Sequence, residues 1–350
     1  MNHDRSIQEC MEAMEEYTPI DLRSPGEYEL NHIPGAVNIP LFNNEERAEI
    51  GTIYKQVGQK EARWRAMEIV SPKLPSILGE IKKISESGKK PLLYCWRGGM
   101  RSRTTALFAE LSGLVVFRIE GGYRAYREYI VNLIPSLIPE KAIIIDGMTG
   151  TGKTKILHQL KQLGYPVLDL ERYANHRGSI FGAITGETPH NQKMFDSLLA
   201  EDLMKMKGSP YFIMEGESKR IGHAVQPPEL YEKKEKGMHI RVSCSLETRV
   251  ERIYEEYVNG AKDPEMFHEK AGEALKRILK RVKPADIQQE LLMHLEEKNY
   301  KEMTRLLMVY YYDPRYANKI SEYTGIFKEV DSESIDNAVQ EIISIIENEC

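Results

Sequence analysis

Two short segments of the sequence bring together residue types that can do chemistry, and the first surrounds Cys95. This cysteine directly follows an apolar run at residues 91–94 and precedes two glycines and a helical pattern. Glycines at such a turn let backbone N–H groups converge on one point, which creates an anion-binding nest at a helix N-terminus. These donors and the nearby arginines keep a thiol in its nucleophilic thiolate form. We therefore predict a catalytic Cys95 and an anion-binding loop formed by Arg97, Gly98, Gly99, Met100, Arg101 and Ser102.

The second segment, GMTGTGKT at residues 147–154, fits the phosphate-loop pattern G-x-x-x-x-G-K-[ST] in full. It follows an apolar run at 142–145 and precedes a helical pattern at 155–163, which is the context that the motif requires. In such a loop the backbone N–H groups surround a diphosphate, the lysine neutralises it, and the final hydroxyl reaches Mg²⁺. The predicted diphosphate-binding residues are Gly147, Thr149, Gly150, Thr151, Gly152, Lys153 and Thr154.

Acidic residues end two further apolar runs in the second half of the chain. Glu215 follows the run 211–214, where it can hold Mg²⁺ together with Thr154. Asp169 and Glu171 follow the run 166–168, where they either face a substrate or cap a helix. No zinc site is expected, because the cysteines lie far apart and lack metal-binding spacing: Cys10, Cys95, Cys244 and Cys350.

Two α/β domains are expected to position these residues, since 350 residues exceed one compact core. Short apolar runs alternate with amphipathic stretches, which is typical of an α/β fold. Two prolines in the stretch 133–139 interrupt a helix, so we place a linker at 133–140 between domains at 1–132 and 141–350. From about Val250 the chain is helical and charged, and this region either belongs to the second domain or forms a helical subdomain. The expected strands are 20–22, 36–39, 91–94, 115–119, 142–145, 166–168, 211–214 and 239–242, and the clearest helices are 73–85 and 103–111.

Composition narrows the class of protein and its setting. A net charge of -5 excludes a uniformly basic nucleic-acid-binding surface but leaves room for a local basic groove. No run approaches about 18 uninterrupted apolar residues, and the N-terminus lacks a secretory pattern. Together with widely spaced cysteines, these features predict a cytoplasmic enzyme with reduced thiols.

The first half resembles rhodanese domains over about residues 10–130. Its ordered matches are Asp21-Leu22-Arg23, Glu27-Tyr28, the run HIPGAVNIP at 32–40, the Cys95 loop and EGGY at 120–123. One departure is that Arg101 lies six positions after the cysteine, whereas many rhodaneses have an arginine at the fifth. The longer loop also resembles those of rhodanese-like phosphatases and arsenate reductases, which implies a phosphate-bearing chalcogen donor.

Both halves together resemble the tRNA 2-selenouridine synthase family through about residue 255. The matching runs are CWRGGMRS at 95–102, DGMTGTGKT at 146–154, ANHRGSIFG at 174–182 and EGESKRIG at 215–222. The resemblance implies a rhodanese-like domain fused to a P-loop NTPase-like domain with a helical C-terminal region.

The activity that this resemblance implies is conversion of wobble 2-thiouridine in tRNA to 2-selenouridine. The sulfur is first alkylated with the geranyl group of geranyl diphosphate, and selenium from selenophosphate then replaces the S-geranyl group. Cys95 either carries the selenium or orients selenophosphate. No bound organic cofactor is implied, and the partners are tRNA and an enzyme that supplies selenophosphate.

Residues outside the two loops extend the predicted site. Those expected to contact substrate follow a strand or lie in a glycine-flanked loop: Asp169, His176, Arg177, Ser179, Glu215, Lys219 and Arg220. Those expected to contact tRNA phosphates share one face of a predicted helix: Lys276, Arg277, Lys280 and Arg281. Arg249 and Arg252 lie among glutamates, which predicts ion pairs within one helix.

Three alternative functions remain open at this point. An ATP-coupled sulfurtransferase of the rhodanese type would carry a persulfide on Cys95 and hydrolyse ATP at the phosphate loop. A nucleotide-switched binding protein with an inactive rhodanese module would need no reactive thiol. A phosphatase would use the C-x5-R loop but would also need a general acid, and no segment of the sequence is evident as one.

Overall fold

The computed structural model describes residues 4–176, 188–261, 263–320 and 326–349. The chain forms two compact units. Unit 1 comprises Met1–Ser136 together with Lys193–Glu201, and unit 2 comprises Leu137–Gln192 and Asp202–Cys350. The predicted α/β class is confirmed in both units, because each contains a five-stranded parallel sheet flanked by helices.

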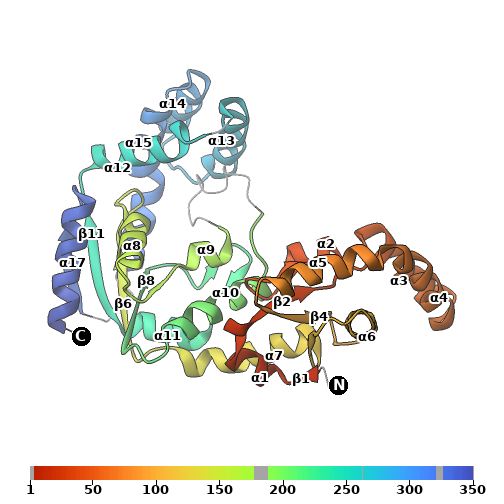
Figure 1. Cartoon of the computed structure of the whole chain (residues 1–350). Coiled ribbons are helices and arrows are strands. Elements are labelled where there is room, and N and C mark those ends of the chain that lie inside the picture. The colour runs from red at the N-terminus through yellow and green to blue at the C-terminus, as the bar shows by residue number, and fades with distance from the viewer. Residues whose placement is uncertain (1–3, 177–187, 262, 321–325, 350) are drawn as a thin grey trace. The chain divides into compact units, whose positions relative to one another are not determined.

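The sheet of unit 1 has the strand order β1-β5-β4-β2-β3, and every neighbouring pair is parallel (Figure 1). Parallel strands align their carboxyl ends at one edge of the sheet, so the residues that follow them are brought together. Cys95 follows the central strand at this edge. The strands are β1 Asp4–Arg5, β2 Tyr17–Asp21, β3 Val37–Asn38, β4 Lys90–Tyr94 and β5 Phe117–Ile119.

Helices cover both faces of this sheet because buried side chains alternate along the strands. Leu93 packs in one hydrophobic cluster with Ile81 of α5 and Ala106 of α6. Tyr94 lies on the opposite face, where its ring centroid is 6.4 Å from that of Tyr123 in α7. The helices are α1 Ile7–Glu12, α2 Pro25–Leu30, α3 Asn44–Gln56, α4 Gln59–Val70, α5 Leu74–Glu86, α6 Met100–Leu111 and α7 Gly122–Leu137.

The stretch expected as a linker, 133–140, is helical as far as Leu137, with Pro135 inside α7. A proline within a helix costs one hydrogen bond. The buried face of α7 nevertheless continues through Ile130 and Ile134, so packing supports the last turn. Only the final three residues of the expected linker lie outside the helix.

The sheet of unit 2 has the order β12-β11-β6-β8-β7, again with parallel pairs throughout. All four strands expected from the apolar runs of this half are present, while β12 was not predicted. A short antiparallel hairpin, β9 Arg220–Ile221 and β10 Ala224–Val225, stands apart from the sheet. The sheet strands are β6 Lys141–Asp146, β7 Val167–Leu168, β8 Tyr211–Glu215, β11 Met238–Ser243 and β12 Phe327–Asp331.

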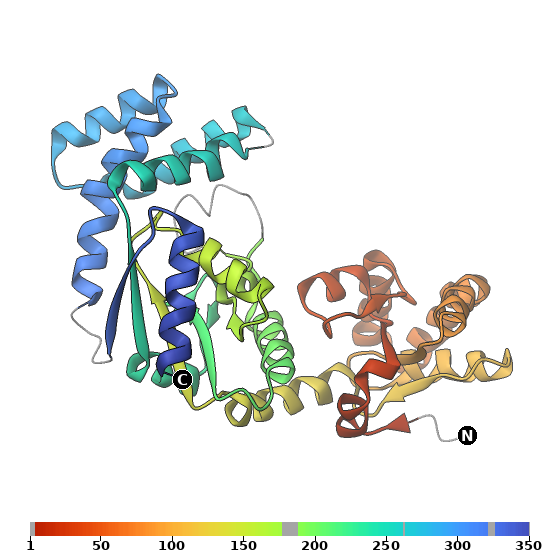
Figure 2. The same ribbon diagram turned by 60° about the vertical axis from the view of Figure 1, so that its left-hand side comes forward.

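Helices also cover the second sheet, as the turned view in Figure 2 shows. Helices α8 and α17 contact each other and share a hydrophobic cluster with Ile143 and Ile145 of β6. Helix α11 contacts β6, and Gly237 at its end packs on Ala142, whose side chain points the other way from Ile143. The helices of unit 2 beside the sheet are α8 Lys153–Gln162, α9 Leu170–Ala174, α11 Pro228–Lys236 and α17 Ile335–Glu349, whereas most of α10 Gln192–Lys205 belongs to unit 1.

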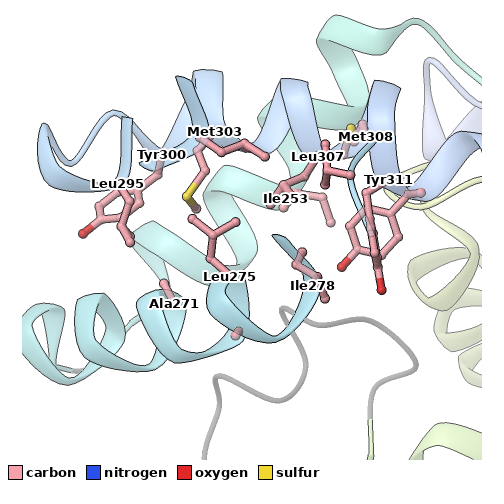
Figure 3. Packing of buried hydrophobic residues seen from close by; sticks show 14 of the residues in the cluster. Ile253, Ala271, Leu275, Ile278, Leu295, Tyr300, Met303, Leu307, Met308 and Tyr311 are labelled. Carbon is pink, nitrogen blue, oxygen red and sulfur yellow. The ribbon is translucent and has the colours of Figure 1, made fainter. Parts of the chain in front are cut away.

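A helical cap, residues 246–320, is inserted between β11 and β12. It has a hydrophobic cluster of its own, drawn in Figure 3, that runs from Val250 to Tyr312. The sequence left open whether the charged C-terminal region forms a helical subdomain or belongs to the second domain. It does both, because residues 246–320 form the helical cap and the chain then returns to the second sheet as β12 and α17. The cap contains α12 Leu246–Ile253, α13 Pro264–Leu279, α14 Ala285–Glu296, α15 Tyr300–Leu307, α16 Asp313–Ile320 and two π-helical segments, Tyr254–Asn259 and Met308–Tyr312. Across the described ranges, none of the helices is both long and apolar enough to cross a membrane.

Candidate active sites

Cys95 lies at the end of β4 and directly before the loop that leads into α6. Its side chain is buried, and Sγ lies 3.4 Å from Oγ of Ser102 in the first turn of α6. Ser102 is also 3.3 Å from the carbonyl oxygen of Gly99, which fixes its hydroxyl beside the thiol. The first turn of a helix carries backbone N–H groups that have no partner within the helix, together with the positive end of the helix dipole, so this position suits an anionic ligand beside the thiol.

The start of α7 holds the Cys95 loop in place. The amide of Tyr123 donates to the carbonyl oxygen of Cys95 at 2.8 Å, and that of Arg124 donates to Trp96 at 3.0 Å. Gly122 has a φ of +62°, and a Cβ there would lie 2.2 Å from the carbonyl oxygen of Cys95. Only glycine fits this approach, which explains the EGGY run of the rhodanese resemblance in physical terms.

The two arginines of the loop differ in their surroundings. Arg101 donates from Nη1 to Oε2 of Glu27 at 2.9 Å. Burial alone would raise the pKa of Glu27, but the charge and hydrogen bond of Arg101 outweigh it, so this pKa lies below its ordinary value. Arg97 is exposed instead. Arg101 is therefore a fixed charge beside the loop, while Arg97 is accessible to a bound anion.

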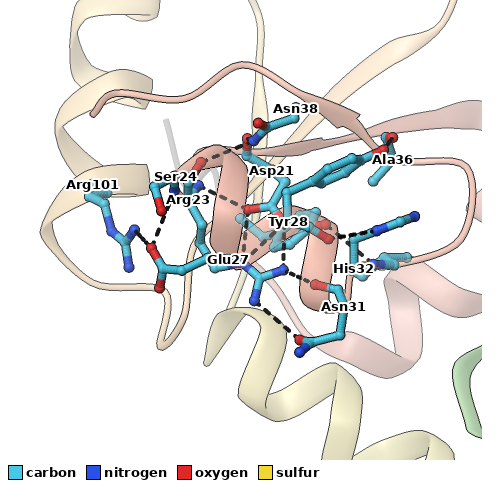
Figure 4. A network of polar contacts seen from close by, with 12 residues as sticks. Asp21, Arg23, Ser24, Glu27, Tyr28, Asn31, His32, Ala36, Asn38 and Arg101 are labelled. Carbon is cyan, nitrogen blue, oxygen red and sulfur yellow. Dashed lines mark hydrogen bonds and ion pairs between the residues drawn. The ribbon is translucent and has the colours of Figure 1, made fainter. Parts of the chain in front are cut away.

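The other rhodanese-like residues form a network of polar contacts, which Figure 4 shows together with Glu27 and Arg101. Asp21 and Arg23 form a buried ion pair with an N–O distance of 2.6 Å. The guanidinium of Arg23 also donates to the carbonyl oxygen of Asn31 and lies 4.3 Å from the ring centroid of Tyr123. Because Tyr123 binds the Cys95 carbonyl, this network connects β2 to the thiol loop. Their role is to position the loop, because the thiol's hydrogen bond in the described part of the chain is to Ser102 and not to any of them.

The phosphate loop of unit 2 runs from the end of β6 to the start of α8. Nζ of Lys153 lies 3.2 Å from the carbonyl oxygen of Met148, within the loop. Burial disfavours the ammonium, but Tyr316 and the nearby Glu215 outweigh it and raise the pKa of Lys153. Lys153 thus stays charged at neutral pH, as neutralisation of a diphosphate requires.

Three carboxylates gather beside this loop: oxygen atoms of Glu171, Glu215 and Glu217 lie within 4.8 Å of one another. The parallel register pairs Ile145 with Glu215, and Oγ1 of Thr154 donates to Oε1 of Glu215 at 2.7 Å. Burial raises the pKa of Glu215 to about 7, partly opposed by the charge of Lys153. Carboxylate and hydroxyl oxygens are the ligands that Mg²⁺ prefers, so the residues present fit this ion.

A cavity of about 520 Å³ opens over the phosphate loop. Glu171 and Arg172 add charge to its wall, and Ile253, Tyr257 and Tyr316 of the helical cap give it an apolar side. The predicted site residues that line it are Thr149, Gly150, Gly152, Lys153, Thr154, Asp169, His176 and Glu215. Gly147 and Thr151 line a smaller adjoining cavity of about 100 Å³.

Two residues of this cavity have further features. Asp169 has both roles that the sequence left open, because it lines the cavity and also caps α9, accepting the amide of Arg172 at 3.0 Å. Nδ1 of His176 is buried and lacks a hydrogen-bond partner among the described residues. A bound ligand would supply that partner.

Other predicted contacts are not brought to the cavity. Lys219 and Arg220 are exposed at the hairpin, where Nζ of Lys219 lies 5.8 Å from the ring centroid of Tyr231. Arg177 and Ser179 fall outside the described residues. The predicted tRNA-binding residues are all exposed, but α13 ends at Leu279, so the last two lie beyond the helix: Lys276, Arg277, Lys280 and Arg281.

The prediction that Arg249 and Arg252 pair within their own helix is wrong. Arg249 is buried, binds Asp313 at 2.6 Å and donates from Nε to the carbonyl oxygen of Thr149 at 2.8 Å. Arg252 donates to the carbonyl oxygen of Thr151 at 2.9 Å. Both arginines therefore bind backbone carbonyl oxygens of the phosphate loop. Their position directly after β11, the parallel neighbour of the loop-bearing β6, is the sequence signal for this role.

Comparison with known proteins agrees with this architecture. Residues 140–344 match the family model described as the tRNA 2-selenouridine synthase AAA domain, and residues 6–129 match the rhodanese-like domain. A tRNA 2-selenouridine synthase of Pseudomonas putida is 32% identical over 324 residues, which cover 85% of this chain and 86% of that protein. A protein of the same name from Pseudomonas syringae is 33% identical over 85% of this chain and 87% of its own length. Another from Nitrosomonas eutropha is 36% identical over 68% of this chain and 62% of its own length. The chain belongs to the tRNA 2-selenouridine synthase family.

Proposed function

We propose that this protein is a cytoplasmic tRNA-modifying enzyme that converts wobble 2-thiouridine to 2-selenouridine, using geranyl diphosphate and selenophosphate. The observation that carries the proposal is the pairing, in one chain, of a buried thiol at a helix N-terminus with a complete phosphate loop. Relatives of this chain that are named tRNA 2-selenouridine synthase support the choice of substrate.

The first step belongs to the cavity of unit 2. The thiocarbonyl sulfur attacks C1 of the geranyl group, the C–O bond breaks, and the diphosphate leaves with the electron pair. Lys153 and the backbone N–H groups of the phosphate loop stabilise the negative charge that develops on the leaving group. Ile253, Tyr257 and Tyr316 offer apolar contacts to the prenyl chain in the same cavity.

Glu215 and Thr154 would hold Mg²⁺ in this cavity, together with Glu171 and Glu217. A diphosphate placed beside three carboxylates would otherwise be repelled. When bound, Mg²⁺ supplies positive charge to the diphosphate oxygens. Catalysis should therefore depend on Mg²⁺, with Lys153 providing the protein's own cation.

The second step belongs to the Cys95 loop. The selenium of selenophosphate attacks C2 of the modified uracil, and the geranyl thiolate leaves with the electron pair of the C–S bond. Water then attacks phosphorus, the P–Se bond breaks with its electron pair on selenium, and phosphate leaves. S-alkylation makes the exchange possible, because a thiolate leaves from the alkylated base more readily than sulfur leaves from a thiocarbonyl. Cys95 either orients selenophosphate in the loop, with Arg97 accessible to its phosphate oxygens, or carries selenium as a perselenide. The second role also needs a two-electron oxidant to form the S–Se bond and a thiol reductant to break it, because the selenium of selenophosphate is at the selenide level.

Mass spectrometry of nucleosides tests the proposal. Transfer RNA that contains 2-thiouridine is incubated with the protein, geranyl diphosphate and selenophosphate, and parallel reactions use Cys95→Ala, Lys153→Ala and Cys10→Ala. Cys10 is a matched control, because burial raises its pKa to about 11 and keeps the thiol protonated. We expect 2-selenouridine from the wild type and Cys10→Ala, S-geranyl-2-thiouridine from Cys95→Ala, and unchanged 2-thiouridine from Lys153→Ala.

ATP hydrolysis without any change of nucleoside mass would reject this function and favour the ATP-coupled sulfurtransferase. Mass spectrometry of the intact protein after exposure to selenophosphate, with and without a disulfide as two-electron oxidant, separates the two roles of Cys95. Selenium bound to the wild type but not to Cys95→Ala indicates a perselenide, and its absence from both indicates orientation of selenophosphate.

A further inference from the structure

A second large cavity lies in unit 1, outside the sites described so far. It is a groove of about 750 Å³ between α3, α4 and α6. Its lining is mostly apolar and includes Phe42, Ile50, Tyr54, Met67 and Phe108. Helix α3 has no fully buried residue among its thirteen; its Ile50 packs partly against the core of unit 1, and Ile50 and Tyr54 line this groove. A volume of this size suits a small apolar ligand.

The groove adjoins the thiol loop. Met100 and Arg101 line it, and both are also part of the loop that follows Cys95. Ser102, the next residue of α6, has its hydroxyl 3.4 Å from the Cys95 sulfur. Cys95 itself does not line the groove, so an apolar chain in the groove would meet the thiol loop at the first turn of α6.

The charges of the groove favour an occupant attached to a polyanion. Four cationic side chains line it, and no carboxylate does: Arg47, Lys55, Arg63 and Arg101. Glu27 pairs with Arg101 at 2.9 Å and lies 3.6 Å from Arg47. Lys55 and Arg63, in contrast, form no ion pair with any residue in the described part of the chain. An apolar chain joined to phosphates fits this combination.

We propose that the groove holds the geranyl chain of S-geranyl-2-thiouridine in tRNA while selenium is delivered at the Cys95 loop. This inference rests on the proposed function and adds a second prenyl site, distinct from the cavity over the phosphate loop. The chain lies among the apolar side chains, the modified base lies at the thiol, and Lys55 and Arg63 meet neighbouring phosphates of the RNA. The groove thereby recognises the intermediate and not the starting nucleoside.

Gly51 offers a way to fill the groove without damaging the fold. It lies in α3 and lines the groove, and a Cβ built there meets no atom closer than 3.7 Å. Its φ lies outside the positive range, so a larger residue is compatible with the helix. Gly79 in α5 is a matched control, because it is also helical, has nothing within 4 Å of its Cβ, and does not line the groove.

Binding of a short anticodon stem-loop tests the proposal on the full chain by fluorescence anisotropy. The stem-loop carries either S-geranyl- or S-methyl-2-thiouridine. We expect the wild type and Gly79→Phe to bind the geranyl form at least about tenfold more tightly, since burial of two methylene groups already corresponds to roughly that factor. Gly51→Phe should lose this preference while its affinity for the methyl form stays within about twofold.

Equal affinity of the wild type for the two stem-loops would overturn the proposal, as would an unchanged preference in Gly51→Phe. Loss of geranyl transfer from geranyl diphosphate in Gly51→Phe, with stem-loop binding intact, would assign the groove to the donor instead and also overturn it. Because binding needs no turnover, a wild type that binds the geranyl form selectively but never forms 2-selenouridine would reject the proposed function alone.

Discussion

Replacing Glu215 with glutamine tests the electrostatics of the phosphate-loop cavity. The Glu215 side chain is 6% exposed, and burial raises its pKa from the ordinary value of 4.5 to about 7. A carboxyl group with a raised pKa binds its proton more tightly in the folded state, so the fold loses stability as the pH rises from the unfolded-state value through the folded-state value. Glutamine keeps an oxygen that can accept the Thr154 hydrogen bond and removes this titration.

The linkage between proton binding and folding gives the size of the effect. With these two pKa values, the Glu215 carboxyl group costs about 2 kcal/mol more of folding free energy at pH 8 than at pH 5.5. In the absence of Mg²⁺ and diphosphate, the free energy of unfolding of Glu215→Gln, relative to that of the wild type, should therefore rise by roughly 2 kcal/mol from pH 5.5 to pH 8. The same substitution should weaken Mg²⁺-dependent binding of diphosphate, because it removes a charged ligand.

Urea unfolding at the two pH values measures this difference, with circular dichroism for the whole chain and tryptophan fluorescence for unit 1. Both tryptophans, Trp64 and Trp96, lie in unit 1, so the fluorescence transition is an internal control that should not change. A stability difference between variant and wild type that is the same at both pH values would refute the reasoning, since it would mean that Glu215 is ionised throughout.

Three other substitutions probe contacts that position the two sites. Lys153→Ala should slow geranyl transfer at least about a hundredfold and leave selenation of an S-geranyl substrate within about twofold, measured on isolated steps, because Lys153 lines the phosphate-loop cavity of unit 2 whereas the Cys95 loop lies in unit 1. Gly122→Ala should abolish selenation and lower the unfolding midpoint of unit 1 more than Gly88→Ala, since both glycines have positive φ but only Gly122 abuts the Cys95 loop. Arg249→Ala should cost about 2 kcal/mol in chemical unfolding of unit 2, because it leaves the partly buried Asp313 carboxylate and the Thr149 carbonyl oxygen without their partner. Arg249→Lys should recover little of this, since lysine cannot pair with Asp313 through two parallel bonds.

Much of the fold was predictable from local patterns. Each of the eight expected strands overlaps a strand of the structure, because buried parallel strands are short apolar runs. β12 was missed because it lies at the edge of its sheet after the helical cap, and of its five residues only Val330 is buried. The predicted linker 133–140 contains the division between the two units after Ser136, but its first five residues are helical, because the buried Ile134 extends α7 past Pro135.

The two loops were predictable for a similar reason, since each is a contiguous motif between a strand and a helix. What surrounds them depends on pairs far apart in the sequence. Arg249 meets Thr149 and Asp313, which are 100 and 64 positions away, and no local pattern encodes either contact. The groove of unit 1 was equally invisible, because its apolar walls come from helices of weak amphipathic pattern whose separation depends on tertiary packing.

The ion pair between Arg249 and Asp313 joins the first helix of the helical cap to the start of its last helix. This junction is the neck of the cap, and the same arginine binds the phosphate loop. Within the described residues, none of α13, α14 and α15 lines either cavity at the phosphate loop, so changes of their length or surface charge leave the lining of these cavities in place. This part of the protein can diversify, for instance to suit another set of RNA substrates, while the catalytic apparatus beneath the neck is inherited unchanged.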